Sequence, residues 1–415
     1  MKEKLLFNPI ADDSKKLVFG GETSNTFNLY DIKYDWAYDS KKGIFGKMLA
    51  NHWVPEKSGM IGDKASYKNL TESEQTAFLK ILSFLIFLDS IQTNNLPNIA
   101  EYITAPEIVL CLSRQQFDEA LHSRSYGYIM TSIFDRETAL KAIYYWREDS
   151  ILLERNKTIA EIYQEFKDNP TEDSFIKVLI ANFLLEGLYF YNGFMFFYNL
   201  ASRGMMTDTA TQIKYINRDE LLHCLLFQNI ISEIRQERPE LFERNKEAIY
   251  DLFKKAVEQE IKFSSSIIGD NVLGMSNQSI YEYTNFLANK RLKQLGLEAI
   301  FDKTKDPYKH LHAIAGIDDE TSNKVNVFEA RSISYKSSNI LDGWDEIWVK
   351  NYHQMLKVLK NYAHSYIILR LSVIIVIKRW LVHALRDIAL KNVLKNTNIN
   401  KNYQSLQEIV SSVGL

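Results

Sequence analysis

The stretch EALHSRSY, residues 119–126, places a carboxylate, an imidazole and a phenol on one helical face, at Glu119, His122 and Tyr126. A second Glu-x-x-His pair occurs at Glu220 and His223, within INRDELLH. Residues three apart share a helix face, so each pair can direct one oxygen and one nitrogen at the same point. A single pair is weak evidence, because helices contain Glu and His by chance. The repetition of the pair therefore decides the prediction.

Each pair is preceded by an apolar segment that contains one acid, Asp89 in SFLIFLDSIQ and Glu186 in ANFLLEGLYFYNGFMFF. An isolated carboxylate buried there is costly or becomes protonated. Two cations surrounded by four carboxylates and two imidazoles remove that cost, because each group offsets the desolvation of the others. This pattern is typical of ferritin-like dinuclear carboxylate proteins. The predicted metal ligands are Asp89, Glu119, His122, Glu186, Glu220 and His223.

The ligand types indicate which metals the site takes. Oxygen-rich ligation with two nitrogens favours iron or manganese over structural zinc or an iron-sulfur cluster. The chain has only two cysteines, Cys111 and Cys224, which cannot supply a cluster, and we expect Cys224 to pack as a small apolar residue.

Apolar periodicity predicts an all-α protein, and the ligand pattern predicts that it is a ferritin-like helical bundle with additional helices. The 7 prolines and 16 glycines leave long segments with a 3.6-residue apolar period. One helix is expected to open at the capping box Thr71–Glu74 and to stop before Pro97, and another to open at Thr104 with Glu107. The expected helices cover residues 71–92, 104–134, 137–166, 171–204, 207–238, 243–268 and 278–297.

Tyr126 lies one turn beyond His122 on the ligand-bearing face. A buried tyrosine usually packs in the core with a partner for its hydroxyl. Here Phe190, Phe194 and Ile216 occupy ligand-side positions on the other two predicted helices. They can wall the phenol off from water and reductants, so Tyr126 is a candidate to hold a radical beside an oxidising metal pair.

At this point the sequence resembles the small, radical-generating subunit of class I ribonucleotide reductase. The resemblance covers residues from about 30 to 347 and rests on LDSIQ, EALHSRSY, LLEGLYFYNGF and INRDELLH. It implies an oxidoreductase subunit whose metal pair forms a tyrosyl radical at Tyr126. The radical would be passed to the large subunit, which holds the substrate and reduces ribonucleotides to deoxyribonucleotides for DNA replication. Phe190, Phe194 and Ile216 match the family's radical pocket, and the resemblance also implies a homodimer.

The resemblance implies a route for radical transfer as well. Trp53 in NHWVPEK matches the family's near-surface tryptophan, and Asp219 matches the acid that links it to His122. Asp219 is adjacent to a predicted ligand and points elsewhere, so a hydrogen bond to a ligand histidine is a reasonable role. In the tail, Tyr335 resembles the tyrosine that bridges to the large subunit, and GWDEI (343–347) resembles the docking end.

The chain continues beyond the point where family members usually end. We predict an N-terminal segment (1–29), a ferritin-like helical domain (30–320), a docking tail (321–347) and a basic extension (348–415). The extension carries ten Lys/Arg and two Asp/Glu. It is either an added interaction module or the product of an altered reading frame, and we favour the latter. In both cases GWDEI is no longer terminal.

Composition limits the partners and the compartment. The net charge is -2, and the residues before the basic extension are acidic, which argues against nucleic acid as a partner. The N-terminus lacks the apolar region of a signal peptide, so we expect a cytoplasmic protein. The longest apolar runs, 81–88 and 366–377, fall short of the roughly 20 residues of a membrane span, and no crossing is expected.

Two other functions use similar ligands. A ferritin-like oxygenase or oxidase would have a substrate cavity in place of the transfer route, and Trp53, Asp219 and Tyr335 speak against it. An iron-storage protein would need a shorter, simpler bundle. The cofactor is predicted to be dinuclear iron, with dimanganese as the alternative, and the manganese form would call for a flavodoxin-like activator.

Overall fold

The computed structural model describes residues 1, 3–38 and 43–315. Within these ranges the regular structure is helical, apart from an isolated antiparallel bridge between Phe19 and Ile103. The all-α, ferritin-like prediction is confirmed. The predicted docking tail with Tyr335 and the basic extension lie outside the described residues.

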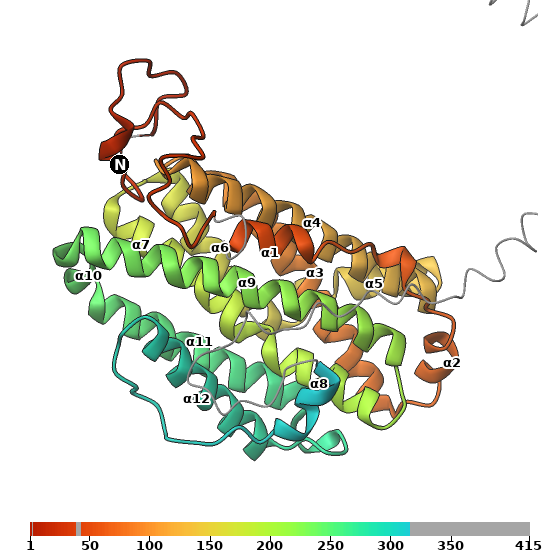
Figure 1. Ribbon diagram of the computed structural model, residues 1–415. Coiled ribbons are helices and arrows are strands. Elements are labelled where there is room, and N and C mark those ends of the chain that lie inside the picture. Colours follow the sequence, from red (N-terminus) through yellow and green to blue (C-terminus); the bar gives the residue numbers. More distant parts are fainter. Residues whose placement is uncertain (2, 39–42, 316–415) are drawn as a thin grey trace, which may run out of the picture. The chain divides into compact units, whose positions relative to one another are not determined.

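The helices that hold the predicted ligands, together with the two that flank the Glu186 segment, pack side by side in the bundle (Figure 1). They are α3 (Glu72–Ala100), α4 (Pro106–Ile133), α7 (Glu172–Leu184), the π-helical segment η4 (Leu185–Tyr189), α8 (Tyr191–Ser202) and α9 (Thr207–Glu237). Helix α3 packs along α4, and α9 packs against α4, α7 and α8.

Shorter helices and turns surround this centre. The remaining α-helices are α1 (Ile44–Ala50), α2 (Asp63–Tyr67), α5 (Arg136–Ile143), α6 (Ser150–Asp168), α10 (Pro239–Arg244), α11 (Lys246–Ile267), α12 (Asn277–Gln294) and α13 (His312–Ala315). The 3-10 turns are η1 (Asp13–Lys15), η2 (Pro55–Lys57), η3 (Tyr145–Arg147), η5 (Gly269–Asn271) and η6 (Lys309–Leu311). Helices α6, α11 and α12 pack on α7 and η4, so they support the segment that contains Glu186.

Local signals placed several helix ends correctly. Thr71 and Glu74 form the expected reciprocal capping box of α3. Gly204, with φ +74°, follows α8 in the left-handed conformation typical of a helix end. Pro239 stops α9 and becomes the first residue of α10, where its missing N–H is no loss.

The prediction that α3 stops before Pro97 is wrong. The helix continues through Pro97 to Ala100. Proline cannot donate to the carbonyl four residues earlier, which is that of Thr93. That carbonyl instead accepts a hydrogen bond from Gln116 Nε2 of α4, at 3.1 Å. The neighbouring helix thus replaces the missing donor, and the helix survives its proline.

The capping box predicted at Thr104 and Glu107 is also wrong. Ala105 is the N-cap residue of α4, and it makes no side-chain cap. The Thr104 hydroxyl donates to the Leu17 carbonyl at 2.7 Å, and Glu107 accepts the backbone amide of Lys33 at 3.0 Å. Both side chains hold the N-terminal segment against the bundle, so long-range contacts replace the local cap.

Three predicted helices are interrupted. The helix expected over 137–166 divides into α5 and α6, because Asp149 caps a new N-terminus by accepting the amides of Ile151 and Leu152. The helix expected over 243–268 begins as α10 and restarts at Lys246 as α11. The helix expected over 171–204 contains the π-helical segment η4, which holds Glu186.

Two core segments have the length and composition of membrane spans. They are Glu72–Ala100, with mean hydropathy 1.4, and Glu172–Ser202, with mean hydropathy 1.3. In the second segment 94% of the apolar window is buried inside the protein, against 56% in the first. The two segments contain Asp89 and Glu186, which face the other ligand-bearing helices. Length and apolarity here are explained by burial in the bundle centre.

Candidate metal centre

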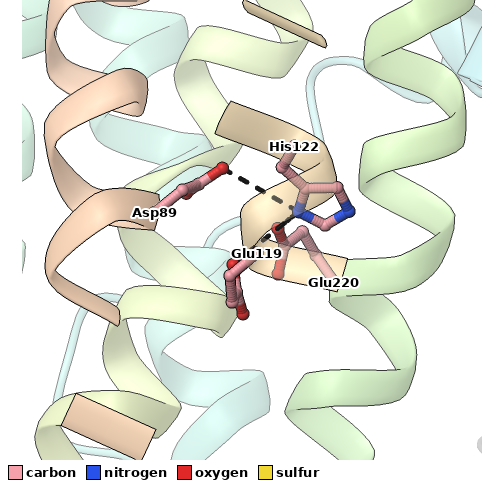
Figure 2. A group of neighbouring side chains, drawn as sticks. All are labelled: Asp89, Glu119, His122 and Glu220. Carbon is pink, nitrogen blue, oxygen red and sulfur yellow. Dashed lines mark ion pairs between the residues drawn. The ribbon is translucent and has the colours of Figure 1, made fainter. Parts of the chain in front are cut away.

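The structure brings the six predicted ligands together. Every one of these side chains is 0% exposed. Their ligand atoms form two overlapping groups, each with all atoms within 4.8 Å of one another, which are Asp89, Glu119, His122 and Glu220 (Figure 2), and Glu119, Glu186, Glu220 and His223. Glu119 and Glu220 belong to both groups. The arrangement therefore has the form of two adjacent cation positions that share two carboxylates.

Both histidines turn the same ring nitrogen toward the cluster. His122 Nδ1 lies 3.0 Å from Glu220 Oε1 and 3.7 Å from Glu119 Oε2. His223 Nδ1 lies 3.0 Å from Glu220 Oε2 and 3.2 Å from Glu119 Oε1. We call the group of Asp89, Glu119, His122 and Glu220 the His122 half, and the group of Glu119, Glu186, Glu220 and His223 the His223 half. Each of the two shared carboxylates thus extends one oxygen to each half. This is the convergence that the i, i+3 spacing predicted.

The donor set fits a pair of cations. Several buried oxygens in the cluster have no hydrogen-bond partner among the described residues, namely both of Asp89, Oε2 of Glu119, Oε2 of Glu186 and Oε1 of Glu220. Burial, together with the negative charge of Glu119 and Glu220, holds the pKa of Asp89 and of Glu186 well above the usual range. Buried carboxylates without donors are costly, and two divalent cations would satisfy them.

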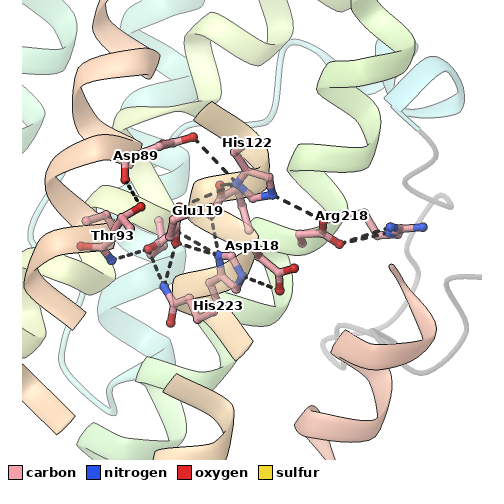
Figure 3. Close-up of polar contacts among 12 residues, drawn as sticks. Asp89, Thr93, Asp118, Glu119, His122, Arg218 and His223 are labelled. Atoms are coloured by element: carbon pink, nitrogen blue, oxygen red, sulfur yellow. Dashed lines mark hydrogen bonds and ion pairs between the residues drawn. The ribbon is translucent and has the colours of Figure 1, made fainter. Parts of the chain in front are cut away.

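A carboxylate lies behind each histidine. Asp219 Oδ2 is 3.4 Å from His122 Nε2 and accepts the indole N–H of Trp53 at 2.7 Å. Asp118 Oδ2 is 3.6 Å from His223 Nε2. Figure 3 shows these contacts on the outer sides of the two rings. A carboxylate that faces the outer nitrogen fixes the tautomer in which the inner nitrogen is free to bind metal.

Trp53 lies near the candidate metal centre and just below the surface. It is 2% exposed, while its neighbour His52 is exposed, so the indole lies one layer below the surface. Its ring centroid is 6.4 Å from that of His122 and 5.2 Å from that of Tyr215. Trp53, Asp219 and His122 form a continuous polar contact from the cluster toward the outside of the bundle.

Tyr126 is 0% exposed, and its hydroxyl makes no hydrogen bond of normal geometry among the described residues. Burial, followed by the nearby charge of Asp89, raises the pKa of Tyr126 well above its ordinary value. The phenol is therefore protonated, and its oxidation must release a proton. The predicted pocket residues Phe190, Phe194 and Ile216 are also 0% exposed, and the two phenyl rings lie 5.8 Å apart.

Glu186 is held by amides on its other side. Its Oε1 accepts from Gln92 Nε2 at 2.6 Å and from Gln115 Nε2 at 2.8 Å. Asn182 Nδ2 lies 3.5 Å away, and Tyr163 donates to Gln92 Oε1 at 2.8 Å. These donors leave Oε2 of Glu186 free to face the cluster.

Two buried arginines hold the π-helical segment around Glu186. A π turn displaces backbone carbonyls from their regular partners. Arg155 of α6 donates to the Tyr189 carbonyl at 2.7 Å, and Arg291 of α12 donates to the Gly187 carbonyl at 2.9 Å. A Cβ at Gly187 would lie 2.7 Å from Arg291 Nε, so only glycine admits this approach. The segment thus depends on residues from two distant helices.

Sequence reasoning missed the residues around the ligands. Asp118, Gln92, Gln115, Asn182 and the two arginines were not predicted. One signal was available for Asp118, because an aspartate immediately precedes the ligand glutamate in both copies of the motif, as Asp118-Glu119 and Asp219-Glu220. The amides and arginines have no such local signal, since their partners are distant in the sequence.

Comparison with known proteins identifies the family. The family described as ribonucleotide reductase, small chain, matches residues 26–307. The ribonucleoside-diphosphate reductase subunit beta of Treponema pallidum is 41% identical over 346 residues, which are 82% of this chain and 97% of the relative. The ribonucleotide reductase R2 subunit from Clostridium botulinum is 40% identical with a TM-score of 0.72, covering 76% of this chain and 99% of that one.

A more distant structure shares the fold alone. The dimanganese(II)-NrdF of Streptococcus sanguinis is 22% identical, with a TM-score of 0.60 over 70% of this chain and 98% of that one. The expected enzyme class, ribonucleotide reductase, is confirmed by the closer relatives. The chain belongs to the ribonucleotide reductase small-chain family.

Proposed function

We propose that the six clustered residues hold a dinuclear metal centre and that Tyr126 is the residue oxidised to a stable radical. The oxidising equivalent would leave along His122, Asp219 and Trp53 toward the large subunit. The observation that supports this most directly is the contact chain from His122 Nε2 to Asp219 Oδ2 (3.4 Å) and on to Trp53 Nε1 (2.7 Å). A metal-storage protein does not require a tryptophan that is linked through an aspartate to a ligand histidine.

When bound, a pair of redox-active metals would supply the oxidising power to take one electron from a phenol. The protein's own residues do the rest. Tyr126 loses an electron and its hydroxyl proton, and the Asp89 carboxylate is the neighbouring acceptor whose charge acts on this phenol. The buried aromatic and aliphatic side chains Phe190, Phe194 and Ile216 keep water and reductants away.

The residues behind the histidines set the direction of transfer. Asp219 fixes His122 and accepts the Trp53 N–H on the same oxygen, so a proton can shift at the indole while an electron moves. We propose that Tyr335, which lies in the predicted tail, is the next residue on the route. The role of the basic extension, residues 348–415, stays a prediction.

Family membership implies a large-subunit partner and a homodimer. We propose that the partner reduces ribonucleoside diphosphates, because the relatives at 37–41% identity are named for that substrate. We propose dinuclear iron as the cofactor, with dimanganese and a flavodoxin-like activator as the alternative, in a cytoplasmic protein. The mixed oxygen and nitrogen ligands suit both metals.

Two cavities among the described residues bear on the oxygenase alternative. A cavity of about 720 Å³ is lined by residues of α10, α11 and the segment after α12, among them Phe242, Tyr250 and Phe301. A second, of about 450 Å³, lies in the N-terminal segment. Neither cavity is lined by a candidate ligand, whereas an oxygenase substrate would have to reach the metals.

The proposal is tested by electron paramagnetic resonance on protein loaded with ferrous iron without oxygen and then exposed to it. We expect a tyrosyl signal, about two metals per chain, and loss of the signal in Tyr126→Phe. If iron gives metal binding without a radical, the same experiment is repeated with manganese and a flavodoxin-like activator. An unchanged signal in Tyr126→Phe would refute the assignment of the radical.

A further inference from the structure

The cluster has one buried carboxylate that the proposed function does not use. Asp118 is 1% exposed and immediately precedes Glu119 on α4. Its Oδ2 lies 3.6 Å from His223 Nε2, and its Oδ1 lies 2.6 Å from Arg114 Nη2. We propose that Asp118 is a positioning residue for His223, held in place by Arg114. The inference rests on the proposed dinuclear centre and adds a residue to it.

The two aspartates are arranged in the same way. Asp219 presents Oδ2 to His122 Nε2 and Oδ1 to Arg218, whose Nη2 is 3.3 Å away. Asp118 presents Oδ2 to His223 and Oδ1 to Arg114. In both cases one oxygen faces a histidine and the other faces an arginine. A single such contact is weak evidence. Its repetition beside the second histidine indicates that each carboxylate orients the histidine that it faces.

The contacts cross between helices. His122 is on α4 and its aspartate is on α9, whereas His223 is on α9 and its aspartate is on α4. Each Asp-Glu-x-x-His copy therefore supplies the carboxylate behind the histidine of the other copy. This orientation follows from helix geometry, because adjacent residues point about 100° apart and the aspartate cannot face the cluster that its neighbouring glutamate faces. Packing α4 against α9 then brings each aspartate behind the opposite ring.

Arg114 is largely buried beside Asp118. Its guanidinium lies over the Phe117 ring, 4.8 Å from the centroid, and its side chain is 10% exposed. The ion pair with Asp118 is therefore shielded from bulk solvent, which favours the orientation in which Oδ2 faces His223. Nε2 of His223 faces that carboxylate at 3.6 Å, and a hydrogen on Nε2 would leave Nδ1, which points toward Glu119 and Glu220, free to bind a metal.

The two aspartates differ in one respect. Asp219 also accepts the Trp53 indole N–H. The polar contacts of Asp118 within the described residues are with Arg114 and His223, and the adjacent aromatic ring is Phe117, which lacks an N–H or O–H group. Within the described residues Asp118 therefore contacts its histidine without a tryptophan beyond it, and the roles of the two aspartates can be separated by experiment.

The test compares Asp118→Asn with Asp219→Asn in the full-length protein. Ferrous iron and manganese(II) are titrated anaerobically, and the affinity of each of the two metals is measured by equilibrium dialysis. Removing a carboxylate behind a ligand histidine typically weakens metal binding by about 10- to 100-fold. We expect this loss in Asp118→Asn for one metal only, the same one that is lost in Glu186→Ala, because Glu186 shares a group with His223 but not with His122.

Further measurements separate a positioning role from a merely structural ion pair. Asp118→Glu should recover part of the affinity, since it restores a carboxylate. Radical transfer, followed as turnover per radical with the large subunit, should fall more in Asp219→Asn than in Asp118→Asn at saturating metal, because Asp219 accepts the Trp53 N–H. If Asp118→Asn does not fold, Arg114→Gln replaces it and should weaken the same metal.

The outcomes are distinct. If the wild-type protein binds fewer than two metals, the proposed function fails. If it binds two and both affinities in Asp118→Asn stay within twofold of wild type, the role of Asp118 alone is overturned. Equal weakening of both metals would also overturn it, because the contact to His223 would then not be the cause.

Discussion

The His122 half and the His223 half of the cluster share their inner ligands and differ in what surrounds them. Both halves use Glu119 and Glu220, and both turn a histidine Nδ1 inward and face its Nε2 with an aspartate. Among the described residues, only the His122 half adds a tryptophan that donates to the aspartate behind its histidine, and its acid Asp89 has the largest charge effect on the pKa of Tyr126. The His223 half adds amides and arginines around Glu186 instead.

This difference shows that two halves with the same inner ligands can have different surrounding residues. Two similar helix pairs build two similar cation positions, because the Glu-x-x-His spacing is the same in each. Under the proposed function, the direction of electron movement would depend on the outer residues, since among the described residues only the His122 half contacts an indole through its aspartate. In the His223 half, amides and arginines hold Glu186 and the π-helical segment around it. Four substitutions would break or sharpen this comparison.

The largest effect is expected from Glu220→Ala, because Glu220 belongs to both halves. Metal content should fall from about two per chain to near none, since the loss removes one of the two shared carboxylates from each position. Glu186→Ala, which affects one half, should remove mainly one metal. Metal analysis after gel filtration measures both. Equal loss in the two variants would contradict the assignment of Glu220 as the shared ligand.

Tyr126→Phe should abolish the radical and reduce turnover to background while both metals stay bound. The substitution removes only the hydroxyl, which makes no hydrogen bond of normal geometry within the described residues, so stability should change little. Paramagnetic resonance and metal analysis on the same sample give the answer. Tyr163→Phe, on the other side of the cluster, is the matched control and should keep the signal. Loss of the signal in Tyr163→Phe would contradict the assignment of the radical to Tyr126 alone.

Trp53→Phe should retain the radical and stop turnover with the large subunit, because phenylalanine cannot be oxidised in the indole's place or donate to Asp219. The control is Trp36→Phe, whose indole donates to Glu233 at 3.1 Å and not to an aspartate behind a ligand histidine. Turnover per radical is measured for both variants. Full turnover in Trp53→Phe would show that the contact between Trp53 and Asp219 is not needed for radical transfer.

The smallest effect concerns stability. Gly187→Ala places a Cβ 2.7 Å from Arg291 Nε in the His223 half and should destabilise the fold by about 1–3 kcal/mol. Gly127→Ala, on α4, meets nothing within 4 Å and should stabilise by about 0.5–1 kcal/mol, since alanine is the better helix former. Denaturant unfolding of the metal-free variants measures both. Similar values for the two would mean that the arginine contact does not constrain the π segment.

Much of the inner site was predictable because its signals are local. The i, i+3 spacing of Glu119 with His122 and of Glu220 with His223 is a property of a single helix, and the lone acids Asp89 and Glu186 stand out within apolar runs. Their convergence required only that the four helical segments pack together with these acids toward the common centre. The residues behind the ligands were harder to find, because Gln92 and Arg291 act on Glu186 and Gly187 from other helices.

The sequence by itself determined the helical class, the six ligand candidates, Tyr126, and the helix ends at Thr71 and Pro239, since all of these depend on spacing or on one residue's backbone chemistry. Only the tertiary structure decided that α3 continues through Pro97, that η4 is a π-helical segment, and that Asp118 lies behind His223. In each case a distant side chain satisfies or places a polar group. Periodicity along the chain reports which face of a helix is buried, but not which donor from another helix will meet it.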